Sequence, residues 1–112
     1  MEIVDKVLEA GYYLKGYAIC KEVNRKIPYS ILARDNCNDI LTCIKNKEKV
    51  RDLDFEVEFE YCLSEITCIV YKWGKADGIF RKHKERIQIK KLDLQMERLA
   101  ELYLKALLML MD

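Results

Sequence analysis

The sequence predicts an α+β fold, with two or three N-terminal helices, an antiparallel meander of two or three strands, and an apolar C-terminal helix. Three observations favour this class. Apolar residues recur at helical spacing near both ends of the chain, the apolar period changes to two in the middle, and an Asp-Gly pair follows the alternating stretch. The length is that of one compact domain, 1–112. An all-α helical bundle is the alternative.

The first helix is expected over residues 2–26, where apolar residues keep a three- or four-residue step: Ile3, Val7, Ala10 and Leu14. Gly11 and Gly16 interrupt it, and each costs about 1 kcal/mol relative to alanine in a helix interior. We attribute both glycines to close packing of another element over this helix. Pro28 ends the first helix or opens the next one, which is expected over residues 29–48.

The middle of the chain has a different period. Apolar and polar residues alternate from Phe55 to Leu63, which is typical of a half-buried strand. Residues 66–73 are rich in β-branched and aromatic side chains and predict a second strand. Asp77 and Gly78 then predict a hairpin turn, with a third strand within residues 79–90. The rival interpretation is a helix, because apolar residues also recur at helical steps: Phe55, Phe59, Leu63, Ile66, Val70 and Trp73.

The C-terminal helix is expected to begin with Asp93 as its N-cap and to run to Met111. Its first turns keep one apolar face, whereas beyond Leu102 nearly every position is apolar. Such a helix has to be buried against the rest of the domain or against a second copy of the chain. A domain this small covers one side of it more easily than all sides. The sequence therefore predicts a homodimer, with an interface formed by Leu104, Leu107, Leu108 and Met111.

Positive charge is concentrated in one segment. The net charge is only +1, but residues 72–91 hold eight lysines and arginines against Asp77 and Glu85, with aromatic residues interleaved. Cations neutralise phosphates and aromatic rings stack on bases, so this mixture indicates binding of RNA or single-stranded DNA. The alternative is an edge strand kept soluble by its lysines. The predicted nucleic-acid-binding residues are Lys72, Trp73, Lys75, Arg81, Lys82, Lys84, Arg86, Lys90 and Lys91.

These patterns predict a small non-enzymatic regulatory or accessory protein that binds nucleic acid through a basic hairpin arm. The single histidine, His83, lies in a lysine-rich run, and the sequence contains no nucleophile elbow, nucleotide loop or metal-binding histidine pair. No catalytic residue, metal or cofactor is therefore expected. The alternative function is a protein–protein interaction module, such as an inhibitor or assembly subunit, that uses the apolar C-terminal helix.

The protein is expected to be cytoplasmic, without a membrane as partner. Glu2 and Asp5 precede the first apolar run, unlike the start of a secretory signal. The apolar run near the C-terminus is about thirteen residues long, whereas a membrane span takes about twenty. Five cysteines without an export signal favour reduced thiols. Their C-x5-C spacings are wider than a zinc knuckle uses, so buried structural thiols are expected.

Overall fold

The computed structural model describes residues 3–47 and 51–111, and in these ranges the chain forms four α-helices and no strand. The α+β prediction is therefore wrong, and the all-α bundle that was its alternative is correct. The outermost positions of two expected helices, residues 2 and 48, lie outside the described ranges. The helices are α1 (Ile3–Ile19), α2 (Val23–Lys45), α3 (Leu53–Gly74) and α4 (Arg81–Met111).

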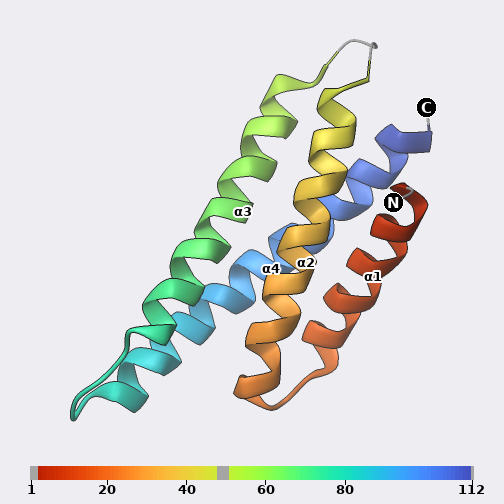
Figure 1. The fold of residues 1–112 in the computed structure, drawn as a ribbon. Coiled ribbons are helices and arrows are strands. Elements are labelled where there is room, and N and C mark those ends of the chain that lie inside the picture. The colour runs from red at the N-terminus through yellow and green to blue at the C-terminus, as the bar shows by residue number, and fades with distance from the viewer. Residues whose placement is uncertain (1–2, 48–50, 112) are drawn as a thin grey trace.

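The helices form an elongated bundle (Figure 1). α1 and α2 lie side by side, α2 packs against α3, and α4 returns along α3 before it crosses behind α2 to reach α1. The start of α1 and the end of α4 lie close together at one end of the bundle, and the turn between α3 and α4 lies at the other. The molecule measures 52 × 24 × 21 Å, so these two ends are separated along its long axis.

Residues 55–73, predicted as two strands, form most of α3. Phe59 is fully buried, but Val57 and Tyr61, which a strand would bury on the same face, are 64% and 60% exposed. The helix begins after Asp52, whose carboxylate accepts a hydrogen bond of 3.0 Å from the Phe55 N–H. A period of two and a period of 3.6 coincide at every fourth residue, so the same apolar residues satisfied both patterns.

Asp77 and Gly78 do lie in a turn, but it joins two helices and not two strands. Gly78 has a φ of +82°, in the left-handed region where the absence of a Cβ atom removes the steric cost. The third strand expected within residues 79–90 is replaced by the first part of α4. This helix begins at Arg81, so Asp93 lies inside it and is not its N-cap.

The break between the first two helices is earlier than expected. α1 ends at Ile19 and α2 begins at Val23, so Pro28 lies inside α2. Pro28 has no N–H to donate to the Asn24 carbonyl one turn earlier, and its ring crowds that carbonyl.

The expected close packing over the two glycines of α1 is confirmed. A Cβ atom on Gly11 would lie 2.8 Å from the Tyr103 hydroxyl, and one on Gly16 would lie 2.7 Å from a ring carbon of Tyr29. Glycine at these positions therefore lets α4 and α2 approach α1.

The core draws side chains from all four helices, and a polar contact joins three of them. Asp93 of α4 accepts a hydrogen bond of 2.7 Å from the Tyr17 hydroxyl of α1, and the Lys26 ammonium of α2 lies 3.1 Å from the same oxygen. Burial and the hydrogen bond to Asp93 both raise the pKa of Tyr17 above its ordinary value.

Within the described residues, no helix combines the length and apolar content needed to cross a membrane.

Candidate nucleic-acid interface

The predicted basic residues gather at the end of the bundle where α3 turns into α4. Lys72 lies in the last turn of α3 and Lys75 is its C-cap, and the other six cations lie on the first part of α4. All eight are exposed. The segment 72–91, called the basic arm below, is therefore a helical hairpin (Figure 1) and not the β-hairpin that was predicted. The cations on α4 are Arg81, Lys82, Lys84, Arg86, Lys90 and Lys91.

The cations of the basic arm are spread around α4. Successive residues are rotated by about 100°, so Lys82, Arg86 and Lys90, which recur every fourth residue, share one flank. Lys84 and Lys91 lie two turns apart on the opposite flank. Arg81 forms an ion pair with Glu85, its Nε atom lying 2.7 Å from the carboxylate. A single bound strand would therefore contact only part of the predicted set.

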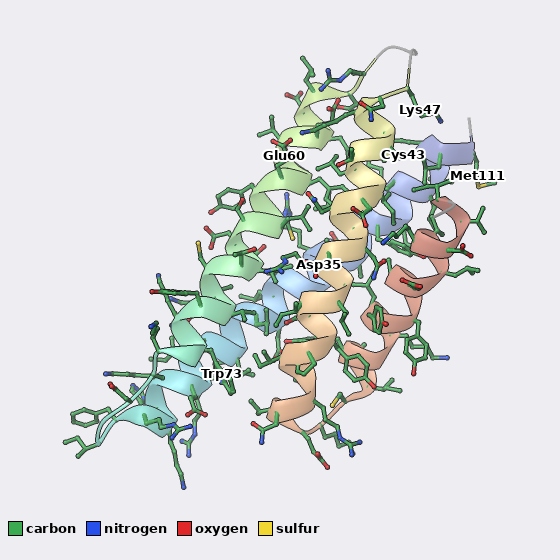
Figure 2. All side chains as sticks on the ribbon, viewed as in Figure 1. Asp35, Cys43, Lys47, Glu60, Trp73 and Met111 are labelled. Carbon is green, nitrogen blue, oxygen red and sulfur yellow. The ribbon has the colours of Figure 1, made fainter. Side chains whose placement is uncertain are left out.

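Trp73, which was predicted to bind nucleic acid, is less exposed than the cations of the arm. It is half-buried and packs against the core, and its Nε1 atom is buried without a hydrogen-bond acceptor among the described residues. Figure 2 shows it at the base of the arm. The exposed aromatic rings at this end belong to Tyr71 and Phe80, and the Lys75 ammonium lies 5.5 Å from the Tyr71 ring centre. Both rings lie beside the turn. The predicted site included neither Tyr71 nor Phe80.

The residues predicted for a dimer interface lie at the opposite end of the molecule, where Figure 2 shows Met111. Leu104, Leu108 and Met111 are 61%, 66% and 82% exposed, whereas Leu107 is partly buried. The Tyr103 hydroxyl of α4 donates a 2.7 Å hydrogen bond to the Val7 carbonyl of α1, which shows that α1 lies beside this part of α4.

The neighbouring turns of α1 also expose apolar side chains. The exposed apolar residues of the two helices at this end are together called the apolar end below: Val4 and Leu8 of α1, and Leu104, Leu108 and Met111 of α4.

The cysteines and the histidine do not form a cluster in the part of the chain that the structure describes. All five cysteines are free. Of the cysteines expected to be buried, Cys37 and Cys62 are, whereas Cys43 is partly buried and Cys68 is exposed. Burial raises the pKa values of Cys37 and Cys62 to about 12 and about 11. His83 is exposed on the arm. Across residues 3–47 and 51–111, no three His, Cys, Asp or Glu side chains are placed to hold a metal ion.

Fold and surface together define a small, elongated four-helix protein with a basic arm at one end and an apolar surface at the other. No protein-family model matches the chain, no curated protein is significantly similar to it, and no solved structure matches it significantly.

Proposed function

We propose that this is a small non-enzymatic accessory protein that binds single-stranded RNA or DNA through the basic arm. The observation that supports the proposal is the concentration of eight exposed cations at one end of the bundle, together with the exposed rings of Tyr71 and Phe80. Clustered cations attract a phosphate backbone, and exposed rings stack on unpaired bases. Of the two acidic residues in the arm, Glu85 is neutralised by Arg81.

The salt dependence of binding tests the electrostatic part of the proposal. If the arm contacts four or five phosphates of a single strand, log affinity should fall with log salt at a slope of about −3 to −3.5. Replacing four arm cations by glutamine should remove about half of that slope or more: Arg81, Lys82, Lys84 and Arg86. The control replaces four cations elsewhere on the bundle, and equal losses from both sets would mean diffuse attraction: Lys15, Lys45, Arg98 and Lys105.

The exposed rings test the stacking part. Tyr71→Ala and Phe80→Ala should each weaken binding by about 1–3 kcal/mol, because each removes one stacked base. Neither substitution removes a charge, so the salt slope should stay unchanged. A loss of slope in these variants would contradict a stacking role.

An anionic lipid surface is the competing partner for clustered cations. Flotation with phosphatidylserine vesicles at the same ionic strength provides the comparison. Capture by vesicles without any binding to an oligonucleotide would overturn the nucleic-acid proposal.

The apolar end favours a second function, self-association. We propose that two copies of the chain pair through this surface, because soluble proteins rarely leave contiguous apolar patches exposed and a two-fold dimer is the commonest way to cover one. Light scattering at micromolar concentration should give the mass of two chains. Leu104 and Leu108 are already exposed, so replacing both by glutamate should give a helical, folded monomer. A wild-type mass of one chain would refute the dimer.

We propose the cytoplasm as the site of action. The five free cysteines suit a reducing compartment. Fractionation of cells that make the protein tests this, and recovery from an oxidising compartment would contradict it.

A further inference from the structure

A groove with a volume of about 370 Å³ lies between the start of α2 and one flank of the basic arm. Val23 and Asn24 of α2 form one wall, and Lys82, Arg86 and Lys90 belong to the other. We infer that this groove holds the phosphate backbone of the bound strand. The strand would then run along one flank of α4 and would not contact the cations on the opposite flank. This inference rests on the proposed function and names the part of the arm that performs it.

The charge of the groove is the first argument. Lys82, Arg86 and Lys90 follow one another every fourth residue, so they are about 6 Å apart along the helix axis. Among the described residues, none of the three has a carboxylate within ion-pair distance. Glu85 also lines the groove, but it is paired with Arg81 at 2.7 Å. A row of unpaired cations suits a linear polyanion better than a single compact anion.

The remaining lining is the second argument. Val23 and Ile89 add apolar surface to the groove, and Asn24 adds an amide that can donate hydrogen bonds. A nucleic-acid backbone alternates sugars, which present C–H groups, with phosphates, which accept hydrogen bonds. Phe80 lies two residues before Lys82, so a strand leaving this end of the groove would meet an exposed ring on which a base can stack.

A matched pair of double variants tests the groove. Lys82→Gln with Lys90→Gln removes two lysines from the groove flank, and Lys84→Gln with Lys91→Gln removes two lysines from the opposite flank. Binding of a fluorescent single-stranded oligonucleotide is followed by anisotropy over a range of salt concentrations. The groove pair should reduce the salt slope by about 1.4, at about 0.7 per phosphate, and lower the affinity about tenfold or more at low salt. The opposite-flank pair should reduce the slope by less than half as much, because those lysines attract the strand only at a distance.

A second variant approaches the groove from α2. Val23→Glu places a carboxylate beside the three cations and should weaken oligonucleotide binding about as much as the groove pair does. Val57→Glu, an equal change at an exposed position of α3, should have no effect. Helical circular dichroism establishes that each variant is folded.

The outcomes separate the groove from the function. Equal losses from both lysine pairs would overturn the groove and leave nucleic-acid binding by the arm intact. Wild-type protein that binds no oligonucleotide would overturn both. Inorganic phosphate at matched ionic strength should compete only weakly, and complete displacement of the oligonucleotide by phosphate would show a single-anion site and overturn the inferred backbone path.

Discussion

At the scale of single residues, the glycines of α1 mark where neighbouring side chains touch the helix backbone. Gly16 lies under the ring of Tyr29, and a Cβ atom there would come within 2.7 Å of a ring carbon. Alanine gains about 1 kcal/mol of helix propensity, but overpacking in a close contact costs about 1–3 kcal/mol. Gly16→Ala should therefore lower the free energy of unfolding by up to about 2 kcal/mol in urea denaturation.

Gly74 provides the control for Gly16. It is the last residue of α3, and a Cβ atom there would meet no other atom within 4 Å. Gly74→Ala should be neutral or stabilise by up to about 1 kcal/mol, because it reduces the freedom of the unfolded chain. If Gly16→Ala were as stable as Gly74→Ala, Tyr29 would be shown to move aside without cost.

Glu56 is a buried carboxylate, 3% exposed, that accepts a hydrogen bond of 3.0 Å from the Arg51 guanidinium. This hydrogen bond lowers the pKa of Glu56, and burial raises it. The positive charges of Arg51 and Lys45 lower the pKa further, so it lies below its ordinary value. A carboxyl group of this kind stabilises the fold above its unfolded pKa. The contribution disappears as the pH falls through the folded pKa.

The lowered pKa of Glu56 predicts how the stability of the protein depends on pH. Wild-type stability should decrease as the pH is lowered from about 5 to about 3, and the decrease should be smaller in Glu56→Gln, which has no carboxylate to protonate. Urea midpoints across this range provide the measurement. Parallel curves for the two proteins would mean that the Arg51–Glu56 pair does not contribute to acid sensitivity.

At the scale of an element, α3 can be distinguished from a strand by two substitutions. Phe59 and Val57 would share a buried face in a strand, but in the helix Phe59 is fully buried while Val57 is 64% exposed. Phe59→Ala should cost about 3–5 kcal/mol of unfolding free energy. Val57→Ala should stay within about 0.5 kcal/mol. Comparable large costs at both positions, or a strand signal in circular dichroism, would contradict the helix.

The same two residues explain why α3 was predicted wrongly. Val57 and Tyr61 are apolar, and one sequence does not show whether an apolar side chain is buried or exposed. The helical spacing of Phe55, Phe59 and Leu63 was visible, but those positions also satisfy the period of two. The helices near both ends were predictable because their apolar stripes fit one period only, although α4 begins at Arg81 and not at Asp93.

The candidate site was predictable in charge but not in shape. A lysine-rich segment is exposed in almost any fold, and all eight cations of the basic arm are exposed in this one. Trp73 was misplaced because its burial depends on how α3 packs in the bundle. The groove depends on Val23 lying beside Lys82 and Lys90, and no local pattern in the sequence signals contact between residues so far apart.

At the scale of the whole molecule, the basic arm and the apolar end lie at opposite ends of a 52 Å axis. A dimer formed through the apolar ends would therefore carry two separated arms. One long strand that reaches both arms should bind more tightly than a short strand, by a factor of about 10² or more, because the second contact is intramolecular.

The monomeric variant tests this coupling. Leu104→Glu with Leu108→Glu should lose the advantage for the long strand and keep the wild-type affinity for the short strand. Anisotropy titrations with the two strands provide the measurement. An unchanged ratio of affinities in the variant would mean that the two arms do not act together.

The position of Trp73 has a practical consequence. It is the single tryptophan of the chain, and it lies half-buried at the base of the arm, next to the surface proposed to bind nucleic acid and far from the apolar end. Indole emission depends on the polarity around the ring. The protein therefore contains an intrinsic fluorophore that responds to changes at one end, so binding at the arm can be followed separately from dimer dissociation without an attached dye.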